Sequence, residues 1–141
     1  MVRMQLDDIA VSGESNQFLL LLRSEDDRML PIVVDAMQAL AIAAGRSGEK
    51  SERPLTHDLV LSLLEVLGAE VNQVEITDLS EGTFYAMLSV ERGGVRFDVD
   101  ARPSDALAVA VRTGAPIYVA EHVLEDSGLS DDTETQGGFE A

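Results

Sequence analysis

The chain has 141 residues, 45% of them apolar, and no cysteine, which suits a single globular domain and excludes disulfides and thiolate sites. No apolar run approaches the roughly 20 residues that span a bilayer, and the first residues lack the apolar core of a signal peptide. The net charge of −16 opposes any broad basic surface for nucleic acid. We therefore expect a cytoplasmic protein that does not bind membranes.

The first third of the chain predicts an antiparallel meander followed by a helix. Apolar runs between turn residues indicate three strands with short connections. They fall at residues 1–12, 17–23 and 29–34, with turns at 13–16 and 24–28. A helix over residues 36–44 is expected to end at Gly45 and Gly48. The polar and basic residues 45–54 then favour a mobile loop.

The rest of the chain predicts two helices and four further strands. Thr56 is a suitable N-cap for a helix that Gly68 ends, and Pro103 suits the first turn of a helix that runs through Arg112. The second of these helices is apolar on all sides, which predicts that it is sandwiched between other elements. The strands are expected at residues 70–79, 83–91, 95–101 and 115–120. The fold class is therefore α+β, with a mostly antiparallel sheet and about three helices.

The domain boundary is expected near the carboxyl end. Residues 1–124 hold all the predicted strands and helices and form one compact domain. Residues 125–141 are acidic, polar and contain glycine, a composition that favours a disordered tail.

The first turn of the helix after Thr56 carries His57 and Asp58. Asp58 suits the positive end of the helix dipole, and His57 suits a partly buried polar position, so neither requires a function. A helix N-terminus also disfavours imidazolium, which leaves a neutral ring able to accept a proton or bind a metal. Arg53, just upstream, could hold an anion there.

Asp98 and Asp100 lie two residues apart on one face of a strand that also carries Arg96 and Arg102. Adjacent carboxylates repel each other unless cations compensate. The flanking arginines allow a ladder of ion pairs, and a hard cation such as Mg²⁺ is the alternative, because it accepts carboxylate oxygens without a tight sequence motif.

Ser104 and Asp105 stand where the last long helix begins, so helix capping accounts for both. Arg102 could pair with Asp105 or bind a phosphate bidentately. The chain has no Gly-rich phosphate loop, no HExxH motif and no G-x-S-x-G elbow. Its few aromatic residues give no obvious platform for stacking bases, and residues 46–53 form the only basic cluster.

Four segments together resemble the bifunctional nuclease family, which is widespread in bacteria and also found in plants. They are residues 53–59, 78–86, 100–106 and 115–119. The resemblance covers roughly residues 1–125 and implies a compact α+β domain that self-associates, with a dimer favoured. Plant members are described as acting on DNA and RNA. One departure is Gln38, because family members often carry an acid at that position.

The resemblance assigns motif positions to this chain without fixed roles. They are Arg53, Thr56, His57, Asp58, Asp78, Gly82, Thr83, Asp100, Arg102, Ser104 and Asp105.

Our first hypothesis is metal-assisted hydrolysis of DNA and RNA without an organic cofactor. The catalytic residues would be His57, Asp58, Arg102 and Asp105. Substrate would contact Arg53, Thr56 and Ser104, and Mg²⁺ or Mn²⁺ would bind Asp98, Asp100 and Asp105. The second hypothesis is a non-catalytic oligomeric module that binds a small anion or a protein partner.

Overall fold

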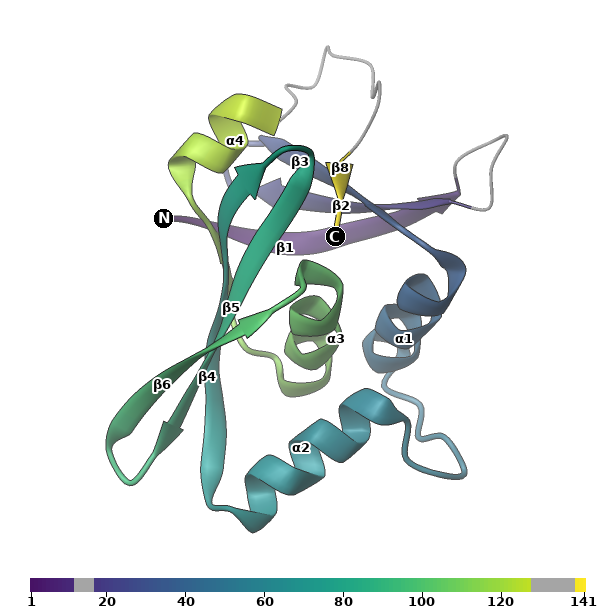
Figure 1. Ribbon diagram of the computed structural model, residues 1–141. Coiled ribbons are helices and arrows are strands. Elements are labelled where there is room, and N and C mark those ends of the chain that lie inside the picture. Colours follow the sequence, from purple (N-terminus) through teal and green to yellow (C-terminus); the bar gives the residue numbers. More distant parts are fainter. Residues whose placement is uncertain (12–16, 128–138) are drawn as a thin grey trace.

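A curled, mostly antiparallel sheet holds helix α3 against its inner face in the computed structural model, which describes residues 1–11, 17–127 and 139–141 (Figure 1). Its strands are β1 (Val2–Val11), β2 (Phe18–Ser24), β3 (Met29–Val34), β4 (Ala69–Ser80), β5 (Thr83–Arg92), β6 (Val95–Ala101), β7 (Ile117–Val119) and β8 (Phe139–Glu140). Its helices are α1 (Ala36–Ser47), α2 (Thr56–Val66), α3 (Pro103–Thr113) and α4 (Glu121–Ser127). The predicted α+β class is confirmed.

The strands of the described residues follow the order β4-β7-β1-β2-β3-β8-β5-β6. Because β4 also pairs with β5, the sheet closes on itself and leaves β6 outside the closed part. The antiparallel meander β1-β2-β3 is confirmed. Two short strands add parallel pairs: β7 lies beside β4, and β8 lies between β3 and β5.

Helix α3 occupies the centre of the core, as its apolar sequence predicts. Seven of its residues are buried, and all but Ser104 are apolar. Its small alanine side chains let the neighbouring elements approach closely, and α1, β4 and β5 all pack against it. The helix ends at Gly114, which takes the left-handed conformation with φ 73°.

The predicted end of α1 at Gly45 is wrong, because the helix continues to Ser47 and only Gly48 takes the left-handed φ of 72°. Gly45 faces the side chain of Arg112. A Cβ atom there would lie 2.6 Å from Arg112 Nη1 and 2.8 Å from a methyl of Val111, closer than real Cβ atoms come. Tertiary packing, not helix termination, therefore accounts for this glycine.

Three other expectations differ from the structure. There is a fourth helix, α4, and it continues through residues 125–127 of the expected tail. The last long strand is shorter than predicted, because β7 spans only Ile117–Val119. Residues 139–140 pair as β8, while the predicted turn at 13–16 and the tail residues 128–138 lie outside the described residues. None of the described helices is long and apolar enough to cross a membrane.

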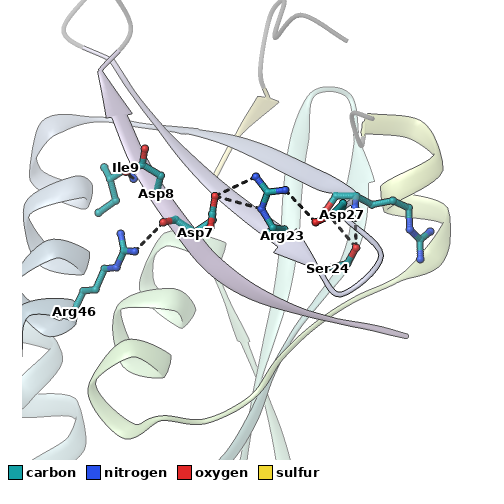
Figure 2. A network of polar contacts seen from close by, with 8 residues as sticks. Asp7, Asp8, Ile9, Arg23, Ser24, Asp27 and Arg46 are labelled. Carbon is teal, nitrogen blue, oxygen red and sulfur yellow. Dashed lines mark hydrogen bonds and ion pairs between the residues drawn. The ribbon is translucent and has the colours of Figure 1, made fainter. Parts of the chain in front are cut away.

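The basic cluster at residues 46–53 is partly used for folding. Arg46 Nη2 donates to the carbonyl oxygen of Asp7 at 2.8 Å, at an irregularity in the β1–β2 pairing (Figure 2). Arg23 of β2 pairs with the Asp7 carboxylate at 3.4 Å and with Asp27 at 3.3 Å. Arg46 thus connects α1 to β1, which weakens the case for this cluster as a nucleic-acid patch.

Candidate functional site

Two polar junctions that lie far apart in the sequence meet in the structure. His57 is on the first turn of α2, and Asp105 is on the first turn of α3. His57 Nε2 lies 2.9 Å from Asp105 Oδ1. Both helices start beside each other because α2 packs against α3, so residues 48 positions apart form a carboxylate–imidazole pair.

Asp105 is held in its ionised form by two partners. Burial raises the pKa of its carboxyl group, but hydrogen bonds from Arg102 and His57 outweigh burial and lower the pKa below its usual value. Arg102 Nε donates to Oδ2 at 3.0 Å. An ionised carboxylate only accepts hydrogen bonds, so His57 Nε2 is the donor in this contact.

The predicted substrate contact Ser104 is only 3% exposed. Its hydroxyl accepts a hydrogen bond from Gln38 Nε2 at 3.1 Å. Gln38 also completes a capping box with Asp35: Gln38 N donates to Asp35 Oδ1 at 2.8 Å, and Asp35 N donates to Gln38 Oε1 at 2.9 Å. An amide at position 38 therefore ties the start of α1 to the start of α3.

Gln38→Ala is expected to lower the free energy of unfolding by about 1–2 kcal/mol, because it removes half of the capping box and the bond to Ser104. Urea unfolding followed by circular dichroism measures the change. Gln38→Glu is the matched variant, since glutamate can also close a capping box. Wild-type stability in Gln38→Ala would show that this link contributes nothing.

Asp58 contacts Arg112 and the backbone rather than Asp105. Its Oδ2 accepts the Leu55 amide hydrogen at 2.8 Å, and its Oδ1 accepts from Arg112 Nε at 2.8 Å. The Leu55 amide first, and the Arg112 guanidinium second, lower the pKa of Asp58. The expected N-cap Thr56 is wrong, because Leu55 takes that position and the Asp58 side chain satisfies its amide. These contacts hold the start of α2, and the catalytic role of Asp58 stays a prediction.

Arg53 and Thr56 flank this junction on the surface. Both side chains are exposed, Arg53 on the loop before α2 and Thr56 at the first helical position. Their positions beside His57 leave them accessible to a bound molecule, so their predicted role in substrate binding stays a prediction.

The three carboxylates predicted to bind a metal do not gather at one point. Asp98 Oδ1 accepts from Ser89 Oγ at 2.6 Å and from Arg96 Nε at 3.0 Å. Asp100 is exposed on β6 opposite Met87, and both oxygens of Asp105 already have partners. The described residues contain no group of three or more His, Asp or Glu that could hold a metal. The ion-pair interpretation holds for Arg96 and Asp98, and metal binding stays a prediction.

A cavity of about 260 Å³ lies beside Arg102, the residue that pairs with Asp105. Its polar lining includes Asp35, Gln38 and Arg102, and β8 contributes Glu140. The Arg102 side chain is 64% exposed, so its guanidinium reaches both Asp105 and solvent. Sequence reasoning missed Asp35, although its spacing from Gln38 is the signature of a capping box.

Comparisons with known proteins agree with these motifs. A model of the bifunctional nuclease domain matches residues 19–132. An uncharacterised protein of Mycobacterium tuberculosis is 48% identical over 122 residues, which cover 86% of this chain and 73% of that protein. Bifunctional nuclease 2 of Arabidopsis thaliana is 30% identical over 115 residues, and bifunctional nuclease 1 of Oryza sativa subsp. japonica is 29% identical over 115 residues. These two alignments cover 78% of this chain but only 35% of each plant protein.

Proposed function

This chain belongs to the bifunctional nuclease domain family, and on that premise we propose that it hydrolyses phosphodiester bonds in DNA and RNA. The observation that carries the proposal is the 2.9 Å contact between His57 and Asp105 beside an exposed guanidinium. A carboxylate-oriented imidazole is a general base, and a neighbouring arginine is a phosphate ligand.

In this proposal His57 Nδ1 takes a proton from a water molecule as the water oxygen attacks phosphorus. The bond between phosphorus and the leaving oxygen breaks, the leaving oxygen takes a proton from water, and the imidazolium then releases its proton to solvent. Asp105 keeps Nε2 protonated and stabilises the imidazolium. Arg102 neutralises the charge that develops on the phosphate oxygens. Arg53 and Thr56, on the exposed side of the same junction, would contact the rest of the substrate.

No step is assigned to a metal ion, because the donor set does not fit one held by protein side chains alone. Asp98 and Asp105 are bonded to arginine, and Asp100 lies apart from them in the described residues. Dependence on Mg²⁺ or Mn²⁺ is therefore a question for the assay below rather than a premise of the mechanism.

The net charge favours a second candidate function, a non-catalytic module that binds a small anion. Acidic residues outnumber basic ones by 26 to 10, so a long polyanion meets a repulsive field. A small phosphate compound meets less of that field and could bind the exposed Arg102 guanidinium.

Cleavage of end-labelled single-stranded DNA and RNA, in Mg²⁺, Mn²⁺ or EDTA, separates the two functions. A nuclease converts both polymers to shorter products, and the EDTA arm reports whether a metal is needed. Folded protein that cuts neither polymer, but melts at a higher temperature with a nucleoside monophosphate, would support the binding module instead.

A further inference from the structure

A second cavity, of about 590 Å³, lies between the last turn of α1, the loop that follows it and the first two turns of α2. A volume of this size is typical of sites that bind small molecules. Within the described part of the chain, neither His57 nor Asp105 lines this cavity. It is therefore separate from the pair that carries the proposed nuclease chemistry.

Arg112 of α3 lies at the floor of this cavity. Its side chain is only 7% exposed, and its Nε donates to Asp58 Oδ1 at 2.8 Å. Its Nη1 donates to the carbonyl oxygens of Ala41 and Ala108. A guanidinium has five N–H donors, so these bonds use three of them. The two donors on Nη2 have no partner among the described residues.

The free Nη2 of Arg112 is accessible from outside the protein. Among the described residues, no fully buried side-chain nitrogen or oxygen lacks a hydrogen-bond partner. Nη2 has no partner, so it is not fully buried, and Arg112 belongs to the lining of the cavity. A nearly buried guanidinium with donors to spare is suited to bind a planar carboxylate.

The loop that closes the cavity adds charges of both signs. Glu49, Lys50 and Glu52 all line it and are all exposed, so they lie at its mouth. Together with Arg112 and Asp58 they give the lining one more negative than positive charge. A phosphate dianion would meet a net negative lining, whereas a molecule with one carboxylate and one ammonium group finds a partner for each. Such a zwitterion has no net charge, so the −16 of the chain does not repel it.

We propose that this cavity binds a free α-amino acid. The carboxylate of the ligand accepts hydrogen bonds from Arg112 Nη2 and from the Lys50 ammonium group. Its own ammonium group donates to the glutamates at the mouth of the cavity. Leu55 and Leu61 also line the cavity and offer contacts to the ligand side chain. The proposal concerns binding alone and does not depend on the proposed nuclease activity.

Isothermal titration calorimetry of the full chain with each common amino acid in turn tests this site. At least one amino acid is expected to bind with a dissociation constant below about 1 mM. Acetate and methylammonium each carry only one of the two charges, and they are expected to bind at least about 10-fold more weakly. Folded protein that binds none of the amino acids would overturn the proposal. Acetate that binds as tightly as the best amino acid would overturn the assignment of a zwitterion.

Two variants locate the ligand without disturbing the helices that Arg112 joins. Ser62 is exposed on α2 and lines the cavity, so the indole of Ser62→Trp fills space that the ligand needs. Lys50→Ala removes one partner of the ligand carboxylate. Each variant is expected to weaken binding at least about 10-fold, with circular dichroism confirming that it is folded.

Leu63→Trp is the matched control, because Leu63 is a 54% exposed neighbour on the same helix that does not line this cavity. Its affinity for the amino acid should equal that of the wild type. Wild-type affinity in either Ser62→Trp or Lys50→Ala would overturn the proposal. An equal loss of affinity in Leu63→Trp would overturn it as well.

Discussion

Asp105→Asn is expected to lower the rate of nucleic-acid cleavage by about 100- to 10,000-fold without unfolding the protein. The ionised Asp105 carboxylate accepts hydrogen bonds from His57 and Arg102 on separate oxygens. An asparagine side chain has one acceptor oxygen, so its amide hydrogens would face one of these donors. The imidazole then loses the partner that keeps Nε2 protonated, and Nδ1 no longer stays free to accept a proton.

Single-turnover cleavage of labelled DNA and RNA measures this loss, with thermal melting in parallel. Asp126→Asn is the matched control, because it removes one negative charge from an exposed position on α4. The control should cleave at the wild-type rate. Equal rates for Asp105→Asn and the wild type would place the chemistry elsewhere or identify a contaminating nuclease.

Arg112→Met is expected to lower the free energy of unfolding by about 2–4 kcal/mol. The Arg112 side chain is only 7% exposed, and it donates to Asp58, to the Ala41 carbonyl and to the Ala108 carbonyl. One guanidinium thus joins α1, α2 and α3. Methionine fills a similar volume but leaves two backbone carbonyls and one carboxylate without this donor.

Urea unfolding measures the change, and Arg92→Met is the control, since Arg92 is exposed on the β5–β6 hairpin. The control should change stability by no more than about 0.5 kcal/mol. A variant Arg112→Met as stable as the wild type would show that the three helices are held together without this residue.

The Asp58–Arg112 pair also predicts how stability depends on pH. Asp58 has a folded pKa below its ordinary 3.8, because the Leu55 amide and Arg112 favour the ionised form. Its contribution to stability is therefore complete above about pH 4 and is lost as the pH falls through the lowered pKa. Unfolding curves collected between neutral and strongly acidic pH should show this loss, and Arg112→Met should show a smaller one. An equal loss in both proteins would assign the acid sensitivity to other carboxylates.

Local patterns predicted most of the secondary structure. The alternation from Val95 to Ala101 is observed as β6, and the apolar helix that begins at Pro103 is buried as α3. Gly45 was misread because glycine commonly ends a helix, whereas here it admits Arg112 from another helix. A two-residue strand such as β8 has no periodic signal and depends on β3 and β5 for its pairing.

The candidate site was less accessible to sequence reasoning. His57 and Asp105 were both singled out, but 48 residues separate them and only the packing of α2 on α3 brings them together. Asp58 was also named as a candidate, and its partner Arg112 lies 54 residues away in the sequence, so their contact was not predicted. Sequence spacing alone does not show that Leu59 and Leu63 of α2 are exposed, because exposure depends on how the helix packs against the rest of the fold.

The most direct test of the central claim is the rate at which wild type and His57→Gln, purified in parallel, cleave labelled single-stranded DNA and RNA. We expect the folded wild type to cut both polymers and His57→Gln to be slower by at least about 100-fold, because glutamine cannot accept the proton. Equal cleavage by the two proteins, or none by a folded wild type with Mg²⁺, Mn²⁺ or EDTA, would contradict a nuclease site at His57 and Asp105.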